Sequence, residues 1–310
     1  MPRGTRSSAA PVQSDAWTVR FWGVRGSVAV PGPDTVRYGG NTACVEIRWG
    51  REIIILDAGT GIRELGKSLV REFAAPPRRL WILITHTHWD HIQGFPFFAP
   101  AYLARQSIRI LGWRGSRSGL KRTVAASVES PFFPVALPQM PGAISVDELR
   151  SFQFRLGPVR ARAARIQHPG GGVAFRLETD AGSIVYAPDH EVACPMATTA
   201  AGPARKKARS THDLRDLVRD ADILIHDAQY TAAEYAGRVG WGHSCVDAVV
   251  RQAAENGVRH LLLFHHDPDR TDAQLDEILA HARALALSLN PRLKVDAARE
   301  GLELRLRRSR

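Results

Sequence analysis

The stretch that most constrains this chain is Leu80 to His91, "LWILITHTHWDH". An apolar run of strand length leads directly into side chains suited to metal binding, namely His86, His88, Asp90 and His91. Placing imidazoles and carboxylates beside a buried strand is costly unless they are paired or bind a cation. On an extended chain, side chains at positions i and i+2 point to the same side, so the first two histidines can bind one ion. The stretch therefore predicts a metal site at the end of a buried strand.

Polar side chains of the same kind end three later strand-like segments. His168 ends "VRARAARIQH", Asp189 ends "GSIVYAPD" and His265 ends "HLLLFH". Core packing could explain one polar side chain at the end of an apolar strand, but it explains several in order less easily. His266 directly follows His265 and is the alternative ligand, although the end of the strand favours His265.

These motifs carry a family resemblance. "THTHWDH", "QHPGG", "YAPDHE" and "LFHHDP" resemble, in content and order, the motifs of the metallo-β-lactamase fold superfamily, over roughly Val19 to Asp267. The resemblance implies an α/β protein with a four-layer αββα sandwich and a two-metal site on one edge. It implies that the first metal is held by His86, His88 and His168, the second by Asp90, His91 and His265, and that Asp189 bridges both. Asp57 in "LDAGTG" resembles the aspartate that supports the first motif in this family.

A further region points to one branch of the superfamily. "LIHDAQY" and "GWGHSCVDAVV" resemble the corresponding region of the tRNase Z and cyclic-phosphate phosphodiesterase branch. There a carboxylate and a histidine beside the metals assist phosphodiester cleavage, and Asp227 and His243 occupy those positions here. Asp90 is a third catalytic candidate, for proton handling. Asp227 departs from the branch, which has glutamate, and the reach is one methylene shorter. His226 is equally well explained as a core histidine or as part of the site.

The expected function is therefore a dinuclear metal-dependent hydrolase. Two divalent ions, with zinc favoured over manganese or iron, would lower the pKa of a shared water, and the metal-bridging hydroxide would attack phosphorus. The glycine-rich segment containing "YGGNT" resembles the small-substrate side of the branch. This favours a phosphodiesterase for a small anionic diester, either a cyclic nucleotide or a cyclic sugar phosphate. The alternatives are a tRNase Z-type RNA-processing nuclease, a hydrolase of carbon esters, thioesters or lactams, and a metal-binding sensor without turnover.

Composition limits the partners and the compartment. The chain of 310 residues is 44% hydrophobic and carries a formal net charge of +11, which favours anionic ligands. Nucleic acid is a less favoured partner, because no basic module with interleaved aromatics is visible. Three widely spaced cysteines and the lack of an apolar leader or spanning segment predict a cytoplasmic protein without a membrane partner. A homodimer is left open. Arg25, Arg37 and Arg176 are candidate phosphate-binding side chains.

The domain organisation is predicted to be simple. Residues 1–16 are expected to form a disordered basic tail, 17–310 a single domain, and 194–213 an exposed insertion within it. The front of the chain is β-rich, and the last third alternates helix and strand. The segment 114–150 is expected to be irregular apart from one helix. The final strand is expected at "LKVDAARE", with "ELRLRRSR" as a mobile end.

Overall fold

Two seven-stranded sheets packed face to face form the centre of the protein. The computed structural model describes residues 16–72, 79–104, 106–114, 119–194 and 210–307. The first sheet has the order β14-β1-β2-β3-β4-β5-β6, and the second has the order β13-β12-β11-β10-β9-β8-β7. The first sheet contains β1 (Ala16–Gly23), β2 (Cys44–Trp49), β3 (Glu52–Leu56), β4 (Leu80–Ile84), β5 (Ser107–Gly112), β6 (Ala143–Glu148) and β14 (Glu303–Arg307). The second contains β7 (Gln153–Leu156), β8 (Val159–Arg165), β9 (Val173–Thr179), β10 (Gly182–Ala187), β11 (Ile223–Asp227), β12 (His260–Phe264) and β13 (Lys294–Ala297).

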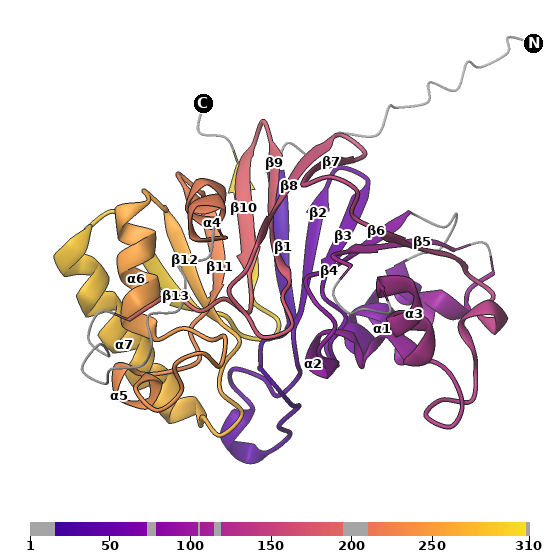
Figure 1. The fold of residues 1–310 in the computed structure, drawn as a ribbon, viewed down its shortest axis with the longest axis horizontal. Coiled ribbons are helices and arrows are strands. Elements are labelled where there is room, and N and C mark those ends of the chain that lie inside the picture. The colour runs from indigo at the N-terminus through magenta and orange to yellow at the C-terminus, as the bar shows by residue number, and fades with distance from the viewer. Residues whose placement is uncertain (1–15, 73–78, 105, 115–118, 195–209, 308–310) are drawn as a thin grey trace, which may run out of the picture.

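Helices cover the outer face of each sheet, which gives four αββα layers (Figure 1). The first sheet is accompanied by α1 (Ile62–Glu72), α2 (Trp89–Ile92) and α3 (Leu120–Ala126), and the second by α4 (Ser210–Val218), α5 (Ala232–Tyr235), α6 (Val246–Glu255) and α7 (Asp272–Leu289). Single 3₁₀ turns lie in the connections at Pro33–Thr35, Phe95–Phe97, Ala99–Tyr102 and Leu137–Gln139. The predicted α/β sandwich is confirmed.

Among the described residues, three large apolar cores and a smaller cluster around Tyr230 and Tyr235 hold these layers together. The central core lies between the sheets, where Phe264 of the second sheet packs against Phe21 of the first, with ring centroids 6.2 Å apart. A second core lies under α4, α6 and α7, and a third lies under α1 and α3. Strands buried on both faces explain the uninterrupted apolar runs of β3, β4 and β12, since each face packs against another layer.

The site is positioned by the parallel strands in each sheet. β3 and β4 are parallel in the first sheet, and β10, β11 and β12 are parallel in the second. Because the carboxyl ends of parallel strands meet at one edge of a sheet, the loops that follow them gather there. Asp57, His86, Asp189 and His265 lie just beyond β3, β4, β10 and β12, and Asp227 is the last residue of β11.

The chain end differs from the prediction of a mobile tail. Glu303–Arg307 forms β14, which pairs antiparallel with β1. Leu302, Leu304 and Leu306 pack against the central core, so the alternating pattern "LELRLR" buries one face and exposes its arginines. The segment 114–150 is also less irregular than expected, because Ala143–Glu148 forms β6 beside β5.

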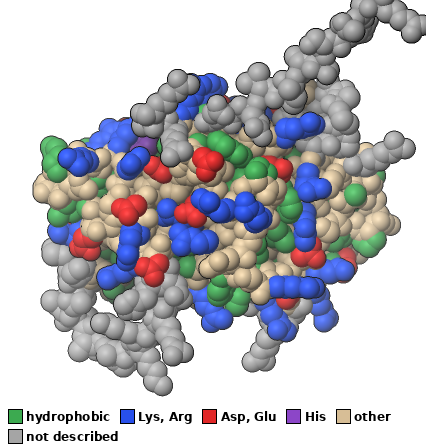
Figure 2. Space-filling view, turned by 90° about the horizontal axis from the view of Figure 1, so that it is seen from above, with side chains coloured by type: hydrophobic (Ala, Val, Ile, Leu, Met, Phe, Trp, Pro, Cys, Tyr) green, Lys and Arg blue, Asp and Glu red, His purple; other side chains and the backbone are tan. Residues whose placement is uncertain are grey.

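The predicted tail and insertion fall mainly outside the described residues. From the segment 1–16, only Ala16 is described, and it begins β1. From 194–213, Cys194 is buried and 210–213 begin α4. In the described part of the chain, no helix is long and apolar enough to cross a bilayer. Figure 2 shows one face of the molecule, where Lys and Arg side chains are interspersed with acidic ones and do not form one continuous basic surface.

Candidate metal centre

The histidine-rich motif lies in a tight loop between β4 and α2. His86 and His88 precede the helix, and Asp90 and His91 lie within it, with their side chains turned inward. The loop is fixed by the backbone: Ala58 N donates to the carbonyl of His91 at 2.7 Å. Gly94 packs so closely against the neighbouring loop that a Cβ there would lie 2.0 Å from a backbone oxygen. The backbone therefore holds the four motif side chains in place before any ligand arrives.

A first group of ligand atoms comes from His86, His88 and His168, and all of these atoms lie within 4.8 Å of one another. Nε2 of His168 is 3.0 Å from Nδ1 of His88. Two of the histidines come from the first sheet and one from the second. The group therefore spans the seam between the two sheets.

A second group comes from Asp90, His91 and His265. Oδ2 of Asp90 lies 3.2 Å from Nε2 of His91 and 3.1 Å from Nε2 of His265. Asp189 lies between the two groups. Its Oδ1 is 3.1 Å from Nε2 of His91, and its Oδ2 is 3.7 Å from Nε2 of His86. One carboxylate thus presents an oxygen to each group.

The donor atoms fit a pair of divalent cations. Nε2 of His86, Nε2 of His91 and Oδ1 of Asp189 are buried and have no hydrogen-bond partner among the described residues. Orphaned buried polar atoms are costly, and a cation bound between them would compensate that cost. Bonds of about 2.0–2.1 Å to one tetrahedral ion place ligand atoms about 3.3 Å apart, close to the separations seen here. Imidazole and carboxylate donors together suit zinc, manganese or iron.

The protonation states of His86, His168 and Asp189 suit ligation, whereas His91 would have to release a proton to bind a cation. Burial lowers the pKa of His86 well below its usual value and also lowers the pKa of His168, so their rings are neutral. Burial alone would raise the pKa of Asp189, but His265, His91 and His86 outweigh it and hold that pKa well below its usual value. For His91 burial acts to lower the pKa, and the surrounding carboxylates outweigh it and raise the pKa well above the usual value.

Hydrogen bonds orient the imidazoles from behind. Nδ1 of His91 donates to Oδ2 of Asp57 at 2.8 Å, and Nδ1 of His168 donates to the carbonyl of Gly242 at 3.0 Å. With Nδ1 used as a donor, Nε2 carries the lone pair that faces the site. Asp57 is fully buried at φ 58° and also accepts from the backbone of Thr85 at 2.8 Å and from the hydroxyl of Tyr186 at 3.0 Å. It lies behind the motif loop, where the resemblance placed it.

The structure brings His265, and not His266, into the second group. His265 has a left-handed φ of 56°, which turns its ring back toward Asp90. The ring packs so closely on Gly26 that a Cβ at Gly26 would lie 2.4 Å from it. His266 points elsewhere, with Nε2 donating to the carbonyl of Ala298 at 2.8 Å.

Asp227 and His243 form a pair beside the two groups. Nδ1 of His243 lies 3.0 Å from Oδ2 of Asp227, so aspartate reaches the histidine despite its shorter side chain. The ring of His243 stacks on His265 at 5.0 Å and 18°, and its Nδ1 is 3.9 Å from Oδ2 of Asp189. Burial opposes protonation of His243, but Asp227 outweighs it and raises the pKa to about 9. His226 lies outside the site, with Nδ1 bonded to the carbonyl of Asp227 at 2.7 Å.

The three candidate phosphate-binding arginines have other roles. Arg25 is fully buried and donates to the carbonyls of Gly39, Asp267 and Arg270. Arg176 donates to two backbone carbonyls near the end of α4, and Arg37 pairs with Asp276 at 2.6 Å. Such a partner set depends on tertiary structure and leaves no sequence motif. Arg25 and Arg176 are thus engaged within the fold, and a phosphate-binding role of Arg37 stays a prediction.

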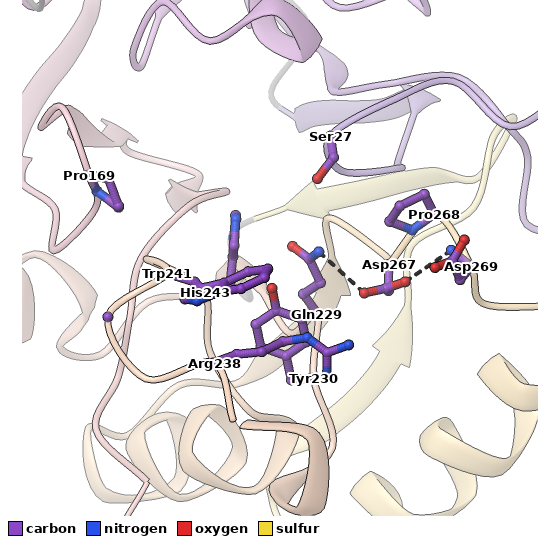
Figure 3. A pocket seen from close by; sticks show the side chains of 11 residues that line it. Ser27, Pro169, Gln229, Tyr230, Arg238, Trp241, His243, Asp267, Pro268 and Asp269 are labelled. Carbon is purple, nitrogen blue, oxygen red and sulfur yellow. Dashed lines mark hydrogen bonds between the residues drawn. The ribbon is translucent and has the colours of Figure 1, made fainter. Parts of the chain in front are cut away.

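Sequence reasoning missed a hollow of about 520 Å³ beside His243. Its walls include Gln229, Tyr230, Arg238 and Trp241, which come from the loops after β11 and α5 (Figure 3). The only sequence signal was the position of Trp241 in "GWGH", two residues before His243.

The αββα fold and the cluster of histidines and aspartates at its edge together define a class, the hydrolases of the metallo-β-lactamase fold with a His/Asp metal site. The chain belongs to the beta-lactamase superfamily domain family, whose model matches residues 52–266.

Known proteins agree with this assignment. Ribonuclease Z of Haloarcula marismortui is 23% identical over 293 residues, which cover 86% of this chain and 90% of the relative. Among solved structures, unliganded yeast PDE1 has a TM-score of 0.66 at 15% identity, over 94% of this chain and 99% of that one. A diphosphatase from the PhnP family has a TM-score of 0.62 at 17% identity, over 93% and 97%. At these identities the structural likeness shows the fold alone.

Proposed function

We propose that the protein is a dinuclear metal-dependent phosphodiesterase that acts on a small phosphodiester. The observation that carries this proposal is the Asp227–His243 pair, which lies against the ligand cluster through the contact of His243 with Asp189. Two divalent cations bound by the cluster would supply Lewis acidity and an activated water. These imidazole and carboxylate donors suit zinc, manganese and iron, and zinc is the ion proposed.

The chain's own residues supply the remaining parts of the chemistry. Asp227 holds Nδ1 of His243, and Nε2 of His243 makes no hydrogen bond to the described residues. Nε2 is therefore available to donate to the leaving oxygen or to the charge that develops on the phosphoryl group. Asp90 accepts a hydrogen bond from the backbone of Ser27 at 2.8 Å, which fixes the carboxylate proposed to handle protons.

A small substrate is favoured by the dimensions of the site. A second hollow of about 470 Å³ lies directly over the ligand groups and shares Ser27 and His243 with the first. Both are of the size of small-molecule sites. The substrate proposed is a cyclic nucleotide or a cyclic sugar phosphate, and a homodimer is compatible with this function.

An RNA-processing nuclease is the second candidate. The observation that favours it is the similarity to ribonuclease Z over most of both chains. The net charge of +11 also suits an RNA ligand. Against it, the arginines expected to bind phosphate are occupied by backbone carbonyls and by Asp276.

One set of assays separates these candidates. Protein loaded with Zn²⁺ or Mn²⁺ is tested on bis-p-nitrophenyl phosphate, 2′,3′- and 3′,5′-cyclic nucleotides, a thioester, nitrocefin and pre-tRNA. Turnover of the diesters without pre-tRNA cleavage supports the proposal. Specific pre-tRNA cleavage establishes the nuclease instead, and turnover restricted to nitrocefin or the thioester overturns both.

A further inference from the structure

The hollow beside His243 adjoins the proposed reaction site. It shares His243 and Ser27 with the hollow that covers the ligand groups, so one molecule can occupy both. In Figure 3 the loop bearing Trp241 and His243 forms one side, and Asp267 and Asp269 form the other. A phosphate held at the ligand groups would place its substituent in this hollow.

Trp241 is presented by a fixed loop. Its side chain is 59% exposed, which is unusual for the largest aromatic residue. The loop is held by Glu191, whose Oε1 accepts from Gly240 N at 2.7 Å and whose Oε2 accepts from Gly242 N at 2.9 Å. The hydroxyl of Tyr235 donates to the same carboxylate at 2.8 Å. Because the backbone of this loop is already fixed, less entropy is lost when a flat ring stacks on the indole.

The charges in the hollow disfavour a second phosphate. Arg238 lies over the ring of Tyr230 at 5.0 Å, donates to the carbonyl of Glu234 at 3.3 Å and forms no ion pair with a described carboxylate. Opposite it are two carboxylates, Asp267 and Asp269, and His243 lines the same hollow, so the charges there nearly balance. The two carboxylates accept hydrogen bonds from hydroxyl and amino groups and leave no excess positive charge to bind a second phosphate. The hollow therefore suits an uncharged, polar and aromatic substituent better than a polynucleotide backbone.

We propose that this hollow is a nucleoside subsite. The base stacks on Trp241, Asp267 and Asp269 accept hydrogen bonds from sugar hydroxyls or base amino groups, and Arg238 donates to an acceptor on the base. This inference rests on the proposed phosphodiesterase function and narrows its substrate class to nucleotides over cyclic sugar phosphates. Gln229 links the subsite to the ligand cluster, since its Oε1 accepts from His265 at 3.3 Å and its Nε2 donates to Asp267 at 3.4 Å.

The test is a comparison of two ligands that differ only by a base. Binding of adenosine 5′-monophosphate and of ribose 5-phosphate to the zinc-loaded protein is measured by calorimetry. Stacking of a base on an aromatic side chain is worth about ten- to a hundredfold in affinity, so the wild type should prefer the nucleotide by that factor. Trp241→Ala should bring the ratio of the two dissociation constants close to one, and Trp241→Phe should retain most of it. Phe132→Ala is the matched control, because that ring is 77% exposed and lies outside the hollow.

Equal affinities in the wild type, no binding of either ligand, or a preference that survives Trp241→Ala would each overturn the subsite. Circular dichroism and zinc content of the variants show that the fold and the cluster are intact. Turnover of methyl p-nitrophenyl phosphate, which has no base, tests the phosphodiesterase proposal separately. If that ester is not cleaved while the nucleotide preference depends on Trp241, the reaction proposed is wrong and the subsite stands.

Discussion

Asp57 offers the sharpest test of how the ligand cluster is held. This buried carboxylate accepts from the backbone and hydroxyl of Thr85, from Tyr186 and from Nδ1 of His91, at 2.8–3.0 Å for its shortest contact with each group. Asp57→Asn keeps the shape but replaces one acceptor oxygen with a donor amide. The donors around Oδ2 would then face an NH₂ group. Hydrogen bonds to a charged acceptor contribute about 1.5–3 kcal/mol each, and they are not additive within one network. We expect a loss of about 3–5 kcal/mol in the free energy of unfolding, as for other broken buried pairs.

The same substitution should weaken metal binding. Without Asp57, Nδ1 of His91 is no longer fixed as a donor, and Nε2 is less well oriented toward Asp90 and Asp189. Loss of a group that orients a ligand typically lowers metal affinity about 10–100-fold. Urea unfolding in the presence of chelator gives the stability of the protein alone. Zinc titration against a competing chelator gives the affinity.

Tyr186→Phe is the matched control, since it removes one donor to Asp57 and leaves the carboxylate in place. It should cost about 1 kcal/mol and leave zinc affinity within a few-fold of wild type. If Asp57→Asn is as stable as wild type within about 1 kcal/mol and binds zinc as tightly, the role derived for Asp57 is refuted.

Three further predictions address other parts of the structure. His243→Ala should keep the zinc content near wild type and lower diester turnover about 10²–10⁴-fold; loss of zinc would show that His243 is itself a ligand. Gly26→Ala should displace the ring of His265, because the new Cβ would lie 2.4 Å from it, and zinc analysis after dialysis should show reduced occupancy. Glu234→Gln should lower stability by about 1–2 kcal/mol at pH 7, after allowance for solvent screening. Burial acts to raise the pKa of Glu234, but Arg270 outweighs it and lowers that pKa to about 2. This stabilisation is therefore fully present above the usual pKa of 4.5 and is lost as the pH falls toward 2; urea unfolding at pH 7, 5 and 3 should show the difference between variant and wild type shrinking.

The cluster was accessible from sequence because its residues are dense and end apolar strands. His86, His88, Asp90 and His91 lie within one short stretch, and His168, Asp189 and His265 each follow shortly after a strand. A strand that leaves the core at one edge places its next polar side chain there, and the family resemblance then assigned these side chains to two metal groups. The structure brings these side chains together, and their roles as metal ligands and catalytic groups stay predictions.

The hollow beside His243 and the contacts of the buried arginines could not be predicted from the sequence in the same way. Arg25 contacts carbonyls of residues 14 to 245 positions away, and nothing in its local sequence announces them. Trp241 is exposed because Glu191, 50 positions earlier, fixes its loop. Strand β14 was missed for another reason. The arginines of the chain end favoured a solvated tail, although the alternating leucines are typical of a strand with one buried face.

Each proposed ligand group takes side chains from both sheets, and this has a consequence for assembly. His86 and His88 belong to the first half of the sandwich, whereas His168, Asp189 and His265 belong to the second. Neither half alone presents a complete set of donors, so cation uptake must follow docking of the two halves. A bound cation pair would then link the two sheets. Its removal should weaken the packing between the sheets before it destabilises either sheet.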